Sequence, residues 1–316
     1  MQSILCPGCH SEKCETLEAI NTSDIIKLYK RSLNIDTSTL FSSTPVIDYM
    51  HCLACDLRFF FPFVSGDEVF YEDLQQFDWY YDQTEKPEYQ FTKQFVAEGA
   101  SVLEVGCGNG LFRSFLPASV RYTGLEFNNK AIQKAQALGL NVKKCSIEKY
   151  AETADSSHDV VCSFQVLEHV SEPMKFLASC AKVTKHGGYV LIAVPAEDGF
   201  LSVATNRSLN IPPHHLTRWS DASLRKLAMN VDLSVEKLWH EPVHDHQRLW
   251  YKKVLARDGL NRLIFGKSRI VDNSLLVKAA LALLKFPPVR EIFAKRSEAL
   301  SPSMQYGHTV ALICRR

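Results

Sequence analysis

Residues 99–240 alternate short apolar runs with stretches of helical spacing, and this alternation constrains the fold more than any other feature of the sequence. The clearest apolar runs are SVLEVG at 101–106, SHDVVCSFQVL at 157–167 and YVLIAVP at 189–195. Their nearly continuous apolar character is typical of parallel strands that helices cover on both faces. The pattern therefore predicts an α/β fold built on a doubly wound, mostly parallel sheet.

Helices are expected between these strands, wherever apolar residues recur at intervals of three or four. They are predicted at 129–140, 171–188 and 221–230. Gly187 and Gly188 mark the expected end of the second helix, and Ser220 or Asp221 is the expected N-cap of the third. A further strand is predicted at 141–147.

Composition removes several classes of protein from consideration. The chain has 316 residues, of which 46% are hydrophobic, so it can bury a full-sized core and is not disordered. Its net charge of +1 disfavours a nucleic-acid binder that relies on bulk positive charge. No apolar run approaches the roughly 18 residues of a membrane-spanning helix, and the N-terminus lacks the basic and apolar regions of a secretory signal. We therefore expect a cytoplasmic protein.

Four of the ten cysteines form two C-x-x-C pairs, Cys6 with Cys9 and Cys52 with Cys55. Two such pairs match a tetrahedral zinc site, and because the protein fills all four positions the ion would be structural. The other cysteines are scattered among apolar segments, which fits a reduced compartment rather than a disulfide scaffold. The long gap between the pairs predicts an insertion at 15–45. Alternative ligands from the same region are Cys14, His10 and His51.

A glycine-rich loop, VLEVGCGNG at 102–110, follows the first of these strands. Glycines let the backbone turn sharply and approach a ligand before the next helix begins. Glu126 ends the following strand, where a carboxylate can accept hydrogen bonds from both hydroxyls of a ribose. The G-x-G-x-G spacing differs from that of dinucleotide sites, and Glu104 inside the strand would repel a phosphate. An acid suits a cationic ligand, so the pattern points to S-adenosylmethionine, which carries an ammonium and a sulfonium group.

These segments resemble the class I S-adenosylmethionine-dependent methyltransferases. The glycine loop is similar to the family's first motif, and YTGLEFN at 122–128 is similar to the segment that holds the ribose-binding acid. CSIEKY at 145–150 resembles the adenine-contact segment, and 158–195 resembles the fourth and fifth strands with the helix between them. The resemblance covers roughly 95–240 and 306–316. It implies a Rossmann-like, seven-stranded methyltransferase sheet with a helical insertion before the last strand.

The resemblance also implies which residues bind the cofactor. Glu104 would orient the amino group of the cofactor, and Glu126 would bind its ribose hydroxyls. The glycine loop would line the methionine part of the cofactor. The loop contributes Gly106, Cys107, Gly108 and Gly110. The remaining residues are Phe127 on the adenine, Ile147 and Glu148 at its border, and Phe164 and Gln165 near the transferred methyl group. Ordinary core packing is the alternative role for Phe127, Ile147 and Phe164.

Methyl transfer to a hydroxyl needs a group that removes a proton, and histidine suits this task at neutral pH. His169 lies just after the fourth strand of the methyltransferase pattern. His214 and His215 follow the fifth strand, in a loop that begins with two prolines. Such sheets bind ligands at the carboxyl ends of their strands. The candidate catalytic residues are therefore His169, His214 and His215, with a helix-start hydrogen bond and loop anchoring as the alternative roles.

The chain divides into three predicted parts. Residues 1–65 would form a zinc-ribbon domain, 66–98 an aromatic linker or cap, and 99–316 the methyltransferase domain. Four linker tyrosines are candidates to cover the cofactor, with packing within the linker as the favoured alternative. They are Tyr71, Tyr80, Tyr81 and Tyr89.

A basic segment precedes the last predicted strand. Residues 241–300 hold 12 Lys and Arg against 6 Asp and Glu, and we expect a helical insertion over 241–305. Its apolar stretch at 274–286 would form either a cap over the active site or an interfacial helix in peripheral contact with a membrane.

Three functions are compatible with this organisation. The order of zinc ribbon, tyrosine-rich linker and methyltransferase domain resembles enzymes that methylate small molecules, namely sugar nucleotides and polysaccharide or natural-product precursors. One alternative is an RNA methyltransferase that grips RNA with the ribbon, which the low net charge disfavours. The other is a non-catalytic, cofactor-binding scaffold. The sequence identifies neither the acceptor, nor the accepting atom, nor the oligomeric state.

Overall fold

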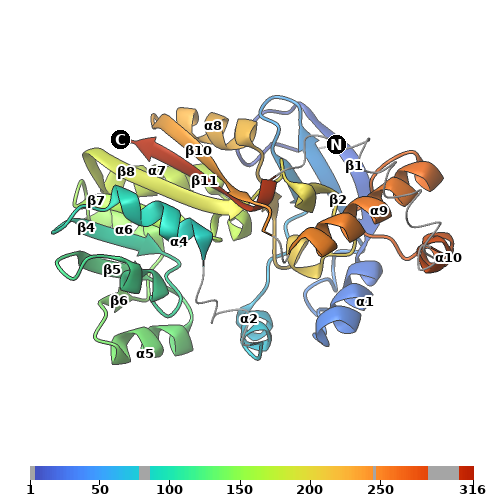
Figure 1. Ribbon diagram of the computed structural model, residues 1–316, viewed down its shortest axis with the longest axis horizontal. Coiled ribbons are helices and arrows are strands. Elements are labelled where there is room, and N and C mark those ends of the chain that lie inside the picture. Colours follow the sequence, from blue (N-terminus) through green and yellow to red (C-terminus); the bar gives the residue numbers. More distant parts are fainter. Residues whose placement is uncertain (1–3, 78–85, 245–246, 284–305) are drawn as a thin grey trace.

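The computed structural model describes residues 4–77, 86–244, 247–283 and 306–316, which two β-sheets organise (Figure 1). The larger sheet has the strand order β10-β11-β8-β7-β4-β5-β6. Its strands are β4 (Ser101–Val105), β5 (Arg121–Leu125), β6 (Val142–Lys143), β7 (His158–Phe164), β8 (Thr184–Pro195), β10 (Ser234–Pro242) and β11 (Tyr306–Arg315). The smaller sheet has the order β1-β2-β3-β9. Its strands are β1 (Cys14–Asn21), β2 (Val46–Cys52), β3 (Arg58–Phe61) and β9 (Thr217–Arg218).

The larger sheet has the predicted seven-stranded α/β architecture. Strands β6, β5, β4, β7 and β8 pair in parallel, and β11 pairs antiparallel with both β8 and β10. The polypeptide enters this sheet at β4, in its interior, and adds β5 and β6 toward one edge. It then returns to form β7 on the other side of β4. Open α/β sheets bind ligands where the strand order reverses in this way, beyond the carboxyl ends of the strands.

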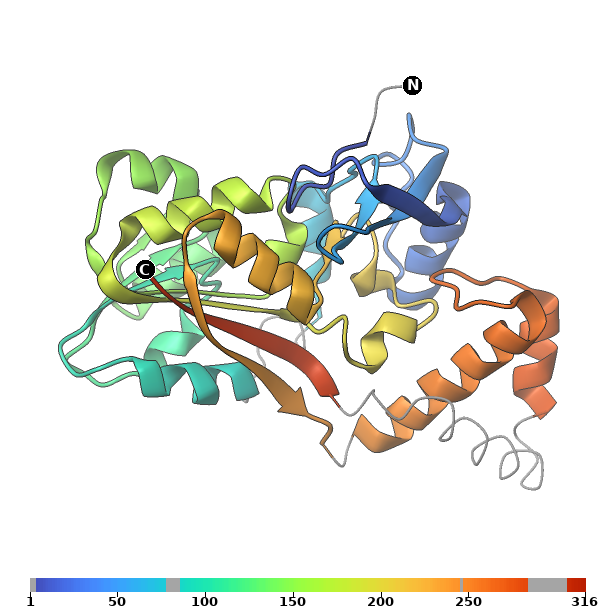
Figure 2. The same cartoon turned by 90° about the horizontal axis from the view of Figure 1, so that it is seen from above.

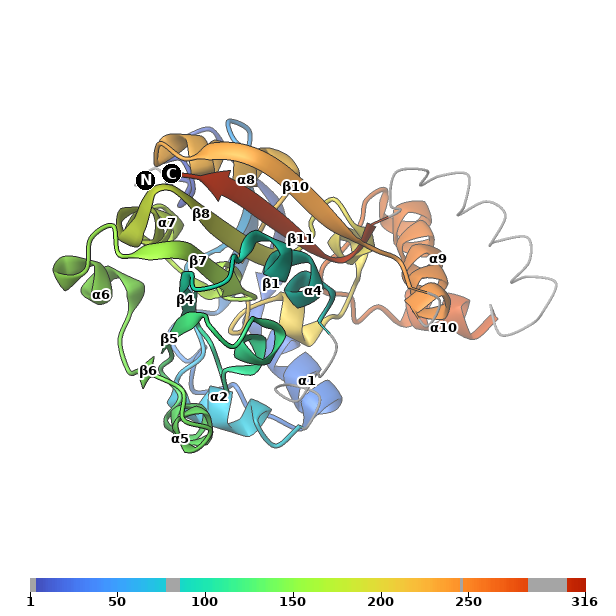
Figure 3. The ribbon, with the colours of Figure 1, turned by 60° about the vertical axis from the view of Figure 1, so that its left-hand side comes forward.

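Helices cover both faces of this sheet. They are α4 (Pro87–Thr92), α5 (Asn129–Ala137), α6 (Ile147–Thr153), α7 (Pro173–Val183) and α8 (Asp221–Asn230), with a 3-10 turn, η2 (Leu111–Phe115), after the glycine loop. Side chains of α6, α7 and α8 belong to one buried cluster, and those of α4, η2 and α5 belong to another. Figure 3 shows α4 lying across one face of the sheet. Burial from both sides explains the nearly continuous apolar character of the central strands.

Several predicted boundaries are wrong, two of them for a clear physical reason, and one helix is confirmed. The helix expected to reach residue 188 ends at Val183, and both glycines lie inside β8, where Arg316 supplies a backbone hydrogen-bond partner to each. The strand expected at 141–147 is short, because the Ser146 side chain accepts a hydrogen bond from the backbone N–H of Lys149 and caps α6. Helix α8 has its predicted bounds, and Ser220 is its N-cap.

The smaller sheet joins two distant parts of the chain. Strands β1 and β2 flank α1 (Thr22–Leu33), so the predicted insertion between the cysteine pairs is a strand and a helix. Strand β3 pairs with β9, which comes from the segment between β8 and β10. Two further backbone hydrogen bonds reinforce this connection, from Phe60 N–H to the Leu216 carbonyl at 3.0 Å and from Gly66 N–H to the Pro213 carbonyl at 2.8 Å.

The hydrophobic core runs without interruption from the cysteine pairs into the larger sheet. Cys55 and Leu57 belong to the same buried cluster as Leu224 of α8 and Val190 of β8. Trp219, which is fully buried, belongs to it as well. The division of the chain at residue 65 remains a prediction from sequence, and any such boundary crosses this shared core.

The described part of the basic segment before β11 contains two helices. Helix α9 (Arg248–Phe265) packs on the turn η4 (Phe200–Val203), and α10 (Leu275–Leu283) packs on α9. Figures 1 and 2 show both helices on the side of the molecule that carries the smaller sheet. In the described parts of the chain, no helix combines the length and apolar character needed to cross a membrane. The predicted membrane contact at 274–286 lies partly outside the described residues and remains a prediction.

Candidate functional site

The glycine loop after β4 requires glycine at two positions. Gly106 and Gly110 have φ values of +73° and +78°, in the left-handed region that side chains disfavour. A Cβ atom added to Gly106 would lie 2.4 Å from Val166 Cγ2, and one added to Gly110 would lie 2.4 Å from Leu140 Cδ1. The loop is therefore a tight backbone turn that leaves no room for side chains at these points.

Glu126 follows β5 and bonds to this loop. Its Oε2 accepts a hydrogen bond from the Gly108 N–H at 2.8 Å, and its Oε1 accepts from the N–H groups of Phe127 at 2.7 Å and Asn128 at 2.8 Å. These three backbone donors fix the orientation of the carboxylate. The Phe127 side chain beside it is 62% exposed, which is unusual for an aromatic ring. An oriented carboxylate beside an open aromatic face fits the ribose and adenine of S-adenosylmethionine.

Glu104 lies in β4 and is buried, with 1% of its surface exposed. Its carboxylate accepts a hydrogen bond from the Tyr122 hydroxyl of β5. Burial raises the pKa of Glu104 to about 8, against the opposing effect of that hydrogen bond. Sequence reasoning did not identify Tyr122, which gave no signal of its own inside an apolar strand. The proposed contact of Glu104 with the cofactor's amino group remains a prediction.

Four other predicted cofactor residues lie around the carboxyl ends of the strands. Ile147 is buried at the start of α6, and Glu148 follows it in the first turn. Cys107 is buried against the backbone of β5, since a Cβ added to Gly124 would lie 2.5 Å from its Sγ. Gln165 follows β7 with a left-handed φ of 57°, and its Nε2 donates to Thr309 Oγ1 at 3.4 Å.

Phe164, at the end of β7, is buried in an aromatic cluster. Its ring lies 4.7 Å from that of Tyr89 and 4.9 Å from that of Phe112, measured between centroids. Tyr89 belongs to α4, so this part of the predicted linker packs against Phe164 in the hydrophobic core. Tyr80 and Tyr81 lie outside the described residues.

The three candidate histidines come together. His169 lies in the turn η3 (Leu167–His169) after β7, and His214 and His215 lie between β8 and β9. Their ring centroids are 4.5 to 4.9 Å apart. Burial lowers the pKa of His169 to about 4 and lowers the pKa values of His214 and His215 well below the usual range. All three imidazoles are therefore neutral at pH 7.

A buried acid and a tyrosine accompany the histidines. Glu168 is 1% exposed, and burial raises its pKa to about 8. Its Oε1 lies 3.9 Å from His169 Nε2 and 3.8 Å from His215 Nε2. Tyr71 of α2 (Glu68–Leu74) places its hydroxyl 3.4 Å from His169 Nδ1. Glu168 escaped the sequence analysis, although a carboxylate directly before the candidate His169 in VLEHV was a usable signal.

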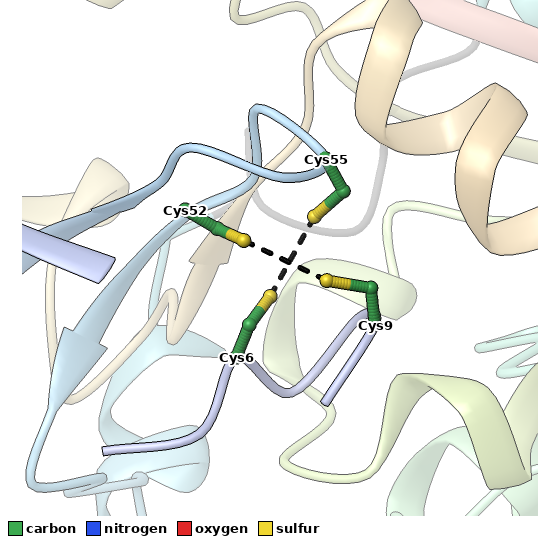
Figure 4. A group of neighbouring side chains, drawn as sticks. All are labelled: Cys6, Cys9, Cys52 and Cys55. Atoms are coloured by element: carbon green, nitrogen blue, oxygen red, sulfur yellow. Dashed lines mark hydrogen bonds between the residues drawn. The ribbon is translucent and has the colours of Figure 1, made fainter. Parts of the chain in front are cut away.

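The two cysteine pairs form a second cluster, shown in Figure 4. The Sγ atoms of Cys6 and Cys55 are 3.6 Å apart, as are those of Cys9 and Cys52. Zinc–sulfur bonds of about 2.3 Å in a tetrahedron imply sulfur–sulfur distances of about 3.8 Å, so the sulfurs fit this ion. His51 instead bonds to Asp56 and Glu15, at 2.8 and 3.1 Å.

Comparison with known proteins locates the chain among methyltransferases. The family model described as "Methyltransferase domain" matches residues 103–192. The ubiquinone biosynthesis O-methyltransferase of Vibrio atlanticus is 30% identical over 169 residues, which cover 48% of this chain and 71% of that protein. The Nitrosospira multiformis protein of the same name is 29% identical over 155 residues, covering 44% of this chain. The chain spans 65% of the length of that protein and 42% of the Vibrio cholerae relatives.

Part of the chain also aligns with solved structures. The crystal structure of a SAM-dependent methyltransferase from Archaeoglobus fulgidus aligns with a TM-score of 0.47 and 17% identity. The alignment covers 73% of this chain and 100% of that one.

Proposed function

This chain belongs to the class I S-adenosylmethionine-dependent methyltransferases, and from that membership we propose that it methylates an oxygen of a small-molecule acceptor. The observation that carries the proposal is the Glu126 carboxylate, which three backbone amides orient beside the glycine loop. Relatives whose names describe O-methyltransferases support oxygen as the accepting atom. The order of cysteine cluster, linker and methyltransferase sheet supports a sugar, polysaccharide or natural-product precursor as the acceptor.

The cofactor would supply an electrophilic methyl group on its sulfonium sulfur. Glu126 would hold the ribose, Phe127 would cover the adenine, and the close-packed glycine loop would admit the methionine part. The acceptor would approach from the side of Gln165 and the histidine cluster, and a neutral imidazole of His169, His214 or His215 would take the hydroxyl proton. The protein's main contribution is then alignment of the two reactants.

We also propose that Cys6, Cys9, Cys52 and Cys55 hold a structural zinc ion. The sulfur spacing supports this proposal, as does the shape of the two loops. Each second cysteine is followed by a residue with a left-handed φ, His10 at 57° and Asp56 at 64°. Such paired turns present two thiolates from each loop, and four protein ligands leave no open position for catalysis.

Calorimetric titration of S-adenosylhomocysteine tests the cofactor site. We expect Glu126→Gln to weaken binding by about 10- to 100-fold, because it removes a charged acceptor of ribose hydrogen bonds. Glu152→Gln, on the exposed part of α6, is the matched control and should bind as the unmodified protein does. Equal affinity in both variants would contradict the proposed site, and release of S-adenosylhomocysteine from S-adenosylmethionine then serves to screen acceptors.

A further inference from the structure

The histidine cluster contains a buried carboxylate that packing does not explain. Neither carboxylate oxygen of Glu168 has a hydrogen-bond partner among the residues that the structure describes. Removing a carboxylic acid from water without such partners costs several kcal/mol, and proteins normally offset the cost with a paired charge, a hydrogen bond or a metal ion. The Nε2 atoms of His169 and His215 lie 3.9 and 3.8 Å from Glu168 Oε1, and imidazole nitrogens are common metal ligands.

Backbone and side-chain oxygens determine which ring nitrogen of each histidine carries the proton. The Nδ1–H group of His169 donates to the His214 carbonyl at 2.5 Å, and that of His214 donates to the Leu209 carbonyl at 2.9 Å. His215 donates from Nδ1 to Asn210 Oδ1 at 3.1 Å. Because these acceptors are oxygens, each neutral ring has its lone pair on Nε2. Histidines that bind metals are oriented by the same kind of second hydrogen bond.

The three imidazoles lie close enough together for an ion to gather them into one site. The ligand atoms of the three histidines all lie within 4.8 Å of one another. Glu168 Oε1 lies 3.9 Å from His169 Nε2 and 3.8 Å from His215 Nε2, which is too long for hydrogen bonds. Two ligands bound at about 2.1 Å in a tetrahedron are separated by about 3.4 Å. A bound ion would therefore draw the three imidazoles together by up to about 1.4 Å, and would bring Glu168, which lies outside the histidine group, about half an ångström closer to His169 and His215.

We propose that Glu168, His169, His214 and His215 bind a divalent first-row transition-metal ion. Three imidazoles and one carboxylate suit zinc, cobalt or nickel, whereas magnesium and calcium prefer sites made of oxygen ligands. This centre is separate from the cysteine cluster, whose four ligands are all sulfur. The protein would therefore bind two metal ions, one through four sulfur ligands and one through nitrogen and oxygen ligands.

The position of the site gives the ion a role in the reaction. It follows β7, directly after Phe164 and Gln165, on the side where the acceptor would enter. A bound ion would hold the acceptor hydroxyl and make it more acidic, in place of a free imidazole base. This role rests on the proposed function, whereas binding of the ion does not.

Cobalt titration tests the inference. Untagged protein is first loaded with one zinc equivalent, which fills the cysteine cluster, and Co²⁺ is then added under argon. We expect one further equivalent to bind, with visible absorption but without the sulfur-to-cobalt charge-transfer band of a thiolate site. Glu168→Gln, which keeps the size of the side chain, and His169→Asn should each weaken this binding by more than about tenfold.

The matched control is His158→Gln. His158 is also buried, but its ring bonds to Ser101 and Tyr150 at the opposite end of β7, so the variant should keep the second ion. Affinity for S-adenosylhomocysteine, measured on every variant, reports folding and tests the cofactor site independently. The inference is overturned if wild-type protein binds no cobalt beyond the cysteine site, or if Glu168→Gln and His169→Asn bind it as tightly as wild type.

Discussion

Glu104 illustrates how a single buried side chain makes stability depend on pH. Burial raises its folded-state pKa to about 8 from an ordinary value of 4.5. Between these two pH values the folded protein keeps a proton that the unfolded chain releases. The free energy of unfolding therefore falls as pH rises through this window, by at most about 1.4 kcal/mol per pH unit from this residue. Below pH 4.5 both states hold the proton, so the residue contributes no pH dependence there.

The matching prediction concerns Glu104→Gln, which keeps an acceptor for the Tyr122 hydroxyl. Urea unfolding of the cofactor-free protein between pH 5 and 8 measures the effect. We expect the variant to gain stability relative to wild type as pH increases. Parallel pH profiles for the two proteins would show that Glu104 does not hold a proton in the folded state.

At the scale of residues, the sequence predicted best where the signal is local. The glycines and Glu126 lie within one strand–loop–helix unit and the strand that follows it, so their spacing alone identified them. Tyr122 acquires its partner Glu104 only when β5 pairs with β4. Glu168 and His215 are likewise 47 residues apart in the sequence, and only the folded chain brings them together. A linear reading cannot supply such contacts, because they depend on the tertiary fold.

Helix α8 is the element whose sequence signal is clearest. Ser220 Oγ accepts from the Ser223 N–H at 3.2 Å, and the Ser220 N–H donates to Ser223 Oγ at 2.8 Å, which forms a reciprocal capping box. We predict that Ser220→Ala lowers the free energy of unfolding in urea by about 1 kcal/mol.

A control comes from the neighbouring helix. Ser179→Ala in α7 removes an exposed hydroxyl that bonds only within its own helix, and should change stability by less than about 0.5 kcal/mol. A loss no greater in Ser220→Ala than in Ser179→Ala would mean that the capping box adds nothing to the stability of α8.

The spacing of apolar residues predicted most strands and helices of the larger sheet, but it did not predict where they end. Gly187 and Gly188 predicted the end of a helix, but they lie in β8 because Arg316 at the other end of the chain pairs with them. Strand β9 has two residues and no apolar pattern, so nothing in the sequence indicated that it would join the smaller sheet. Both features depend on residues that are distant in sequence.

At the scale of the whole molecule, the cysteine cluster and the histidine cluster are mechanically connected. Strand β3, which follows Cys55, pairs with β9 through Phe59 and Thr217. The same segment reaches Glu168, whose carbonyl accepts the Leu216 N–H at 2.8 Å. A change in the loops that hold the four cysteines can therefore reach the histidine cluster through hydrogen-bonded backbone alone.

Zinc removal should reveal this connection. After treatment with a chelator, we expect amide hydrogen exchange to become faster in 58–61 and 213–218, while β4 and β5 keep their protection because they lie in the interior of the larger sheet. Mass spectrometry of peptides measures both regions in one experiment. Faster exchange confined to the cysteine loops would contradict the connection, and restored protection after zinc is returned is the control for irreversible damage.

The shared core has a consequence for modularity. Proteins that join a metal-binding module to an enzyme usually allow either part to be exchanged, because few side chains cross the junction. Here Trp219 and Leu57 are buried in a single cluster, although they come from opposite sides of residue 65. A chimaera that replaces the first 65 residues would have to reproduce that interior, and a truncated chain would expose it to water. The N-terminal part is thus an inseparable component of the enzyme rather than an interchangeable accessory.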